Sequence, residues 1–197
     1  MLYPASTESS PHLGHLIWQT SATETKKPTW RAGHLRQVSA LMQLFGSPLA
    51  QAGLDEDFES KTRRLAPRAD GLGSSREFTV RGYGEGLAGL FWRNVFGPPF
   101  VRMFGERLAT LPSDVRRELG GGLVLVQPYE LPTQAGTPEA AARERELIAH
   151  LGPECFYDHE RHTPPTRRPQ LPLPGEGGDV PRRTCSGEAG GRGGESG

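Results

Sequence analysis

Residues 91–108, FWRNVFGPPFVRMFGERL, contain a change from strand-like to helix-like sequence. The aromatic and β-branched run at 91–96 is typical of a strand, although a helix beginning near Glu85 would also fit. A Gly-Pro-Pro sequence then interrupts the chain, and Pro99 suits the start of a helix because its missing N–H would have no partner there. The residues that follow predict a helix with one apolar face, made of Phe100, Met103, Phe104 and Leu108.

A hairpin and a second helix are predicted downstream of this stretch. The runs 115–119 and 123–127 flank three consecutive glycines, which favour a tight turn between antiparallel strands. The second run begins LVLV, which is apolar on both faces and therefore typical of an interior strand. Thr137 can then cap a helix that has Pro138 at its first position, and Gly152 followed by a proline ends that helix.

The sequence upstream is less regular. From His34 onward, apolar residues at helical spacing predict a short helix that ends at Gly46. Residues 76–81 alternate apolar and polar side chains, as in a half-buried strand. Between these elements, an acidic run at 55–59 and a basic run at 61–68 favour a solvated loop with local ion pairs.

These elements predict one α+β domain over residues 34–162, with a mainly antiparallel sheet and two or three helices packed against it. Residues 1–33 are rich in Ser, Thr and Pro and predict a loose N-terminal arm, with Trp18 and Trp30 as candidate anchors. Residues 163–197 are rich first in proline and then in glycine, and predict a disordered tail. The 26 glycines and 18 prolines among 197 residues agree with a limited core.

The aromatic residues are concentrated where the strand meets the helix. We interpret this cluster as a seam of the core, and the alternative is an exposed patch that binds a partner. Its members are Phe91, Trp92, Phe96, Phe100 and Phe104.

Two motifs resemble binding sites. Residues 84–89, GEGLAG, match the G-x-G-x-x-G pattern of dinucleotide-binding turns, but no long buried strand precedes them and no β-α-β unit follows. We therefore predict a flexible turn and no cofactor.

Cys155, His159 and His162 are spaced as metal ligands can be, yet a structural zinc site needs a fourth ligand and His150 is the only candidate. We therefore predict no metal and a polar loop or strand.

The charge balance and the sequence motifs argue against several classes of function. The 23 basic and 23 acidic residues argue against binding of nucleic acid or an anionic membrane by bulk attraction. No G-x-S-x-G motif occurs and nothing near Cys155 would lower the pKa of its thiol, so no catalytic residue is predicted.

Cys185 lies in the Gly-rich tail, so we expect no disulfide between Cys155 and Cys185. With neither a secretory signal nor a long apolar run, we expect a cytoplasmic protein.

Three segments carry a family resemblance: FWRNVFGPPFV at 91–101, GERL at 105–108 and LGGGLVLV at 119–126. Together they resemble the C-terminal half of bacterial immunity-type proteins of type VI secretion and polymorphic-toxin systems, over about residues 76–152. The resemblance implies a strand that ends in an Asn-x-x-Gly-Pro-type turn, a helix, and then a strand pair with a glycine-rich turn. Residues 1–57 depart from the family because they supply one helix at most.

The resemblance further implies a non-enzymatic protein that binds and neutralises a cognate bacterial toxin, with no catalytic or cofactor-binding residue to carry over. One alternative is a small metal-binding protein or enzyme that uses residues 155–162. Another alternative is a non-functional, truncated remnant of the family.

Overall fold

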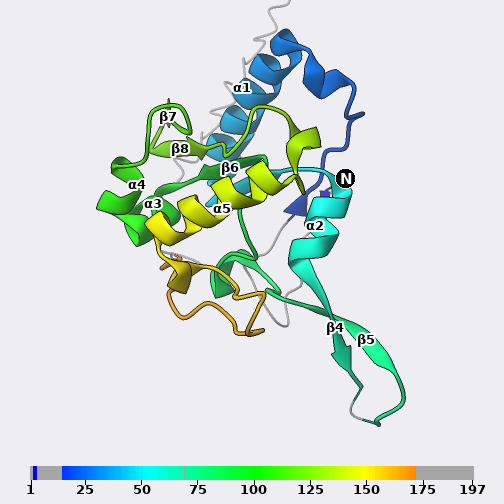
Figure 1. Cartoon of the computed structure of the whole chain (residues 1–197). Coiled ribbons are helices and arrows are strands. Elements are labelled where there is room, and N and C mark those ends of the chain that lie inside the picture. The colour runs from blue at the N-terminus through cyan, green and yellow to red at the C-terminus, as the bar shows by residue number, and fades with distance from the viewer. Residues whose placement is uncertain (1, 4–14, 69, 172–197) are drawn as a thin grey trace, which may run out of the picture.

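The computed structural model describes residues 2–3, 15–68 and 70–171 (Figure 1). The segments 4–14 and 172–197, which hold much of the predicted arm and tail, and with them Cys185, lie outside the described residues. The chain begins with a short antiparallel pair, β1 (Leu2–Tyr3) and β2 (His15–Leu16).

A four-stranded antiparallel sheet forms the centre of the fold. Its strands lie in the order β3 (Leu49–Ala52), β6 (Arg93–Phe96), β8 (Leu123–Val126) and β7 (Arg116–Gly120). All residues of β6 and β8 are buried, because each of these strands has a neighbour on both sides and helices on both faces. The predicted hairpin, the interior position of LVLV and the strand in 91–96 are therefore confirmed.

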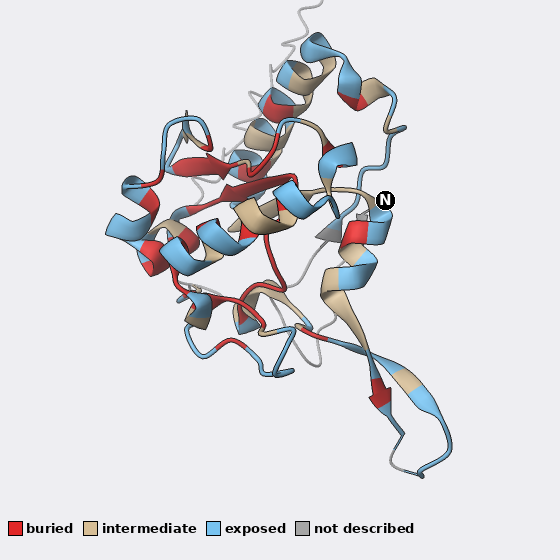
Figure 2. Cartoon of the chain, in the orientation of Figure 1, coloured by how far each residue is buried: buried red, intermediate tan, exposed pale blue. Residues whose placement is uncertain are grey.

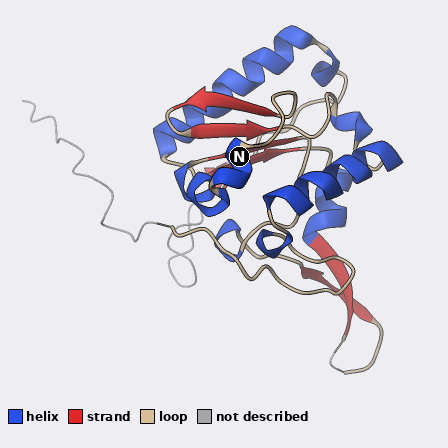
Figure 3. Ribbon diagram, turned by 60° about the vertical axis from the view of Figure 1, so that its left-hand side comes forward, coloured by secondary structure: helices blue, strands red, loops and turns tan. Residues whose placement is uncertain are grey.

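Helices cover both faces of this sheet (Figures 1 and 3). On one face, α1 (Pro28–Phe45) places Leu35 and Met42 in a cluster with Val95, Leu123 and Leu125. On the other face, α3 (Pro98–Phe104), α4 (Glu106–Ala109) and α5 (Pro138–Leu151) pack against Phe96, Val124 and Val126. The α+β class with a mainly antiparallel sheet is confirmed.

The helices at 98–109 form two elements where one was predicted. Gly105 has φ 57° and ψ −132°, a conformation that only glycine adopts readily, and it separates α3 from α4. Short 3-10 turns link other elements: η1 (Glu24–Lys26), η2 (Tyr83–Glu85), η3 (Pro132–Gln134) and η4 (Pro153–Cys155).

The aromatic cluster is a core seam, as interpreted from the sequence. Phe96 and Phe100 are fully buried and Phe104 is 2% exposed. Their rings are in contact, with centroids 5.7 Å apart for Phe96 and Phe100 and 5.0 Å apart for Phe96 and Phe104. Phe91 and Trp92 are buried as well. Figure 2 shows that burial extends along β6 and β8.

The acidic and basic runs at 55–68 are not a solvated loop. They form α2 (Asp55–Thr62) and β4 (Arg63–Pro67), and β4 pairs with β5 (Ser74–Phe78) in a hairpin that projects from the body (Figure 1). The helix is stabilised by Phe58, whose ring stacks on Phe91 at 4.1 Å. The strand predicted at 76–81 is confirmed only over 76–78, because β5 ends at Phe78, and Phe78 is 56% exposed where a half-buried strand was predicted.

Both predicted domain boundaries fall within ordered structure. The arm was predicted to end at residue 33, but α1 begins at Pro28, where a proline is favoured and Trp30 packs beside the cluster around Trp92. The tail was predicted to begin at residue 163, but the amides of Thr166 and Arg167 donate to the Glu154 carbonyl. Residues 28–33 therefore belong to α1, and residues 163–171 pack against the body.

We expect Phe100→Ala to lower the free energy of unfolding by about 3–5 kcal/mol, since the substitution removes a fully buried ring and leaves a cavity. Denaturant unfolding of the purified variant measures this loss. Phe45→Ala is the control, because Phe45 is 59% exposed at the end of α1 and its loss should change stability by about 0.5 kcal/mol or less. Equal stability of Phe100→Ala and the native protein would contradict the core assignment.

Candidate functional site

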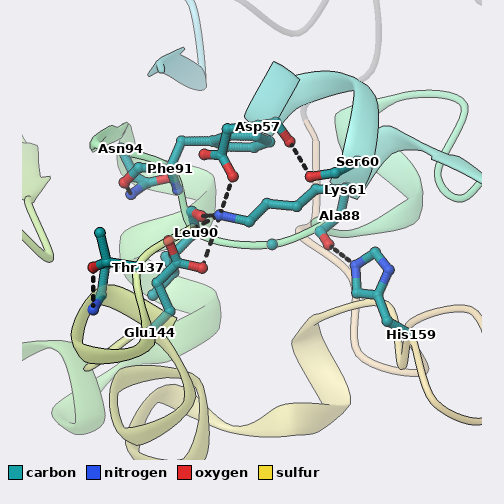
Figure 4. Close-up of polar contacts among 12 residues, drawn as sticks. Asp57, Ser60, Lys61, Ala88, Leu90, Phe91, Asn94, Thr137, Glu144 and His159 are labelled. Atoms are coloured by element: carbon teal, nitrogen blue, oxygen red, sulfur yellow. Dashed lines mark hydrogen bonds and ion pairs between the residues drawn. The ribbon is translucent and has the colours of Figure 1, made fainter. Parts of the chain in front are cut away.

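A buried polar cluster joins α2 to α5 (Figure 4). The Lys61 ammonium lies 2.8 Å from Asp57 Oδ1 and 2.8 Å from Glu144 Oε2, and it donates to the Leu90 carbonyl at 2.6 Å. Asp57 and Lys61 are one helical turn apart on α2, whereas Glu144 comes from α5. We call these three residues the Lys61 cluster.

The surroundings of the Lys61 cluster are apolar. The ammonium lies 5.1 Å from the centre of the Phe91 ring, and the lysine stem passes so close to Gly89 that a Cβ there would contact it at 3.1 Å. Burial raises the pKa of Glu144, and burial together with the charge of Glu144 raises the pKa of Tyr129. Two carboxylates thus share one ammonium in a poorly solvated site.

The geometry of the Lys61 cluster is that of a structural tie. All three ammonium hydrogens have an acceptor within the protein, which leaves none for a substrate. Asp57 Oδ2 is buried without a hydrogen-bond partner in the described part of the chain. The cluster therefore fixes α2, and with it the base of the β4–β5 hairpin, against α5.

A second polar centre lies at the start of β6. The Asn94 amide is fully buried and accepts from the Phe91 amide at 3.1 Å and from Gln51 Nε2 at 3.2 Å. It also donates to the carbonyls of Phe91 and Val126 at 2.9 and 3.2 Å. These four hydrogen bonds satisfy the side chain and fix the bend before β6, so Asn94 is a structural residue.

The residues considered as metal ligands are not brought together. His159 Nε2 donates to the Ala88 carbonyl at 2.7 Å (Figure 4). His162 lies in a left-handed turn with φ 55°. Cys155 is fully buried, and burial raises its pKa to about 11, so the thiol stays protonated near neutral pH. Within residues 15–68 and 70–171, no group of three or more His, Cys, Asp or Glu side chains is arranged to hold a metal ion.

The glycine motif at 84–89 forms a turn without a following helix. Gly86 has φ 119° and lies against Pro165, where a Cβ would collide with the proline ring. Leu87 then bridges to Phe156 in an extended conformation. A dinucleotide site places its glycines at a helix N-terminus, so this segment does not have that geometry.

A group of basic residues on the α1 face of the sheet was not predicted from the sequence. Arg93, from β6, is 5% exposed and donates to the Arg31 carbonyl at 3.0 Å and to Gln127 Oε1 at 3.1 Å. It also contacts His34 Nδ1 at 3.0 Å, and burial together with the charge of Arg93 lowers the pKa of His34 to about 4. The His34 ring is therefore neutral and can accept this hydrogen bond.

Comparison of the chain with protein-family models, with curated proteins and with solved structures gave no match in any of the three. Among the described residues, no helix combines the length and the apolar character that crossing a bilayer requires.

We expect Lys61→Met to lower the free energy of unfolding by about 3–5 kcal/mol at pH 7, because it leaves Asp57 and Glu144 buried without their cation. Loss of the ammonium raises the folded-state pKa of Glu144 further above its ordinary value of 4.5. A carboxyl group whose pKa is raised on folding lowers the free energy of unfolding at pH values above 4.5 and does not lower it below that pH. The loss of stability in the Lys61→Met variant should therefore shrink as the pH falls toward 4.5.

Chemical denaturation of the variant and the native protein between pH 7 and 4.5 measures this difference. Lys27→Met is the matched control, because Lys27 pairs with Glu24 at an exposed position and its loss should cost less than about 1 kcal/mol. A loss of unfolding free energy that stays constant with pH would contradict the claim that unpaired buried carboxylates destabilise the variant.

Proposed function

We propose that this protein acts without catalysis, by binding another protein through the β4–β5 hairpin, and that the partner is a bacterial toxin that it neutralises. The choice of a toxin rests on the resemblance of residues 76–152 to immunity-type proteins. The choice of the hairpin rests on one observation: three large apolar side chains are exposed on an element that projects from the body.

The exposed apolar residues of the hairpin support a contact surface. Leu65, Leu72 and Phe78 are 70%, 78% and 56% exposed, and all three lie within residues 63–78. Figure 2 colours most of this hairpin as exposed or intermediate. Single exposed apolar residues are common, but three on one projecting hairpin concentrate apolar surface where a partner has free access. Binding would remove this surface from water, which is the usual source of affinity in protein interfaces.

The backbone of the hairpin supports the same use. The sheet of β4 and β5 has two strands in the described part of the chain, so each strand presents one edge of unpaired N–H and C=O groups. Such edges bind an added strand from a partner.

The base of the hairpin is firmly held. Thr79 donates its amide to the Thr62 carbonyl at 2.9 Å and its hydroxyl to the Lys61 carbonyl at 2.7 Å. The Lys61 cluster in turn ties α2 to α5. A hairpin held in this way loses less conformational entropy on binding than a mobile one.

The charge of the hairpin favours an acidic partner surface. Residues 63–78 contain four arginines against Asp70 and Glu77. Arg64 pairs with Glu77 across the strands at 3.0 Å and Arg68 pairs with Asp70 at 3.1 Å. Arg63 and Arg76 share Glu59 of α2, so one net positive charge remains beside the exposed apolar residues. Complementary charge raises the rate of association with an acidic surface and disfavours basic ones.

We expect the double variant Leu65→Ser, Leu72→Ser to weaken toxin binding at least tenfold while its melting temperature stays within about 2 °C of the native value, since both side chains are exposed. The candidate toxins are the products of the neighbouring genes, tested by co-expression for rescue of growth and by purification of the complex. The matched control is Leu44→Ser, Phe45→Ser, which alters two exposed apolar residues at the end of α1.

The two parts of the proposal fail separately. If no neighbouring gene product is neutralised or bound, the toxin assignment is wrong. If a toxin is bound and the hairpin variant binds it as tightly as the control does, the hairpin is not the contact surface.

A further inference from the structure

A pocket of about 360 Å³ opens between the start of α1 and the strands β7 and β8, away from the hairpin. Four arginines line it, against a single acidic residue, Asp114. The arginines are Arg31, Arg93, Arg116 and Arg117. Asp114 pairs at 3.0 Å with Arg143, which is not one of the lining residues. The lining of the pocket is therefore strongly positive.

Arg93 is the buried centre of this lining. Its guanidinium is held by three neutral acceptors, the Arg31 carbonyl, Gln127 Oε1 and His34 Nδ1, and it packs 4.2 Å from the Trp92 ring. No carboxylate in the described part of the chain lies within ion-pair distance of it. The hydrogen bonds orient the group but leave its charge without a counter-ion, which is a costly arrangement for a buried cation.

The neighbouring arginines leave this charge uncompensated. Arg31 pairs with Glu130 and Arg116 pairs with Glu118, and both carboxylates are at the solvent, 74% and 73% exposed. Arg117 has no ion pair among the described residues, and Arg116 Nε is buried without a hydrogen-bond partner there. Burial, and then the charges of Arg117 and Arg31, lower the pKa of Arg93 to about 10, in keeping with a positive cluster that no acid neutralises.

We propose that this pocket binds the phosphate group of a small molecule. A guanidinium offers a planar set of donors that matches phosphate oxygens, and a phosphate monoester carries nearly two negative charges and three acceptor oxygens. It can therefore compensate several arginines at once, which a single carboxylate cannot. The volume lies within the range of ligand pockets and leaves room beyond the phosphate for an organic part.

This site is independent of the hairpin, so it is tested on the isolated native chain. The probes are inorganic phosphate, adenosine monophosphate as a phosphate monoester, and acetate, each compared with chloride at equal ionic strength. Tryptophan fluorescence reports binding, because the Arg93 guanidinium lies over the Trp92 ring, and thermal unfolding reports it independently, since a bound ligand raises the melting temperature.

We expect saturable binding of phosphate or of adenosine monophosphate, with a rise in melting temperature that chloride and acetate do not give. Arg117→Gln should weaken this binding about tenfold or more and leave folding intact, because Arg117 is exposed. Arg145→Gln is the matched control, an exposed arginine on α5 that does not line the pocket, and it should bind as the native protein does.

Tighter binding of adenosine monophosphate than of phosphate would show that the organic part is held too, and equal binding would limit the site to the phosphate. An equal response to acetate, or equal loss in the two variants, would overturn the proposal, as would the absence of a saturable response to both phosphate probes.

Discussion

The structure depends on the burial of β6 on both faces. Val95 points to α1 and Phe96 to α3 and α4, so neither face of the strand can be left to water. The sheet must therefore be covered twice, which sets the three-layer arrangement of helix, sheet and helices (Figure 3). Asn94, a polar residue on the same strand, is tolerated because four hydrogen bonds satisfy its amide.

Both proposed binding surfaces are connected to this strand. The segment before it supplies the Leu90 carbonyl to Lys61, which fixes α2 and the base of the hairpin. The first residue of the strand, Arg93, supplies the buried cation of the arginine pocket. The two proposed surfaces lie on different parts of the molecule, so the two proposals do not compete for the same residues. A rigid centre with functional groups at its margins is a common division of roles in small domains.

The sequence predicted those elements in which local signals and packing agree. The Gly-Pro-Pro break and the apolar face beginning at Phe100 specify α3, and the glycine turn beside LVLV specifies the hairpin of the central sheet. It did not predict α2, because Phe58 is the only apolar residue among its eight, and the helix depends on an ion pair with Glu144, 83 positions away. The arginine pocket was missed for the same reason, since Arg31, Arg93 and Arg117 meet only through strand pairing and the packing of α1. Cys155, His159 and His162 are close in sequence, but in the described part of the chain they do not form a group that could hold a metal ion, and His159 instead donates to the Ala88 carbonyl.

The central functional claim is that a partner protein contacts the β4–β5 hairpin. Amide hydrogen exchange, measured on the free protein and on its complex with the neutralised toxin, tests this claim most directly. We expect amides of residues 63–78 to gain protection in the complex, because the exposed strand edges become paired or covered. Amides of β6 should exchange at the same rate in both states. Protection gained elsewhere on the surface, with 63–78 unchanged, would contradict this claim.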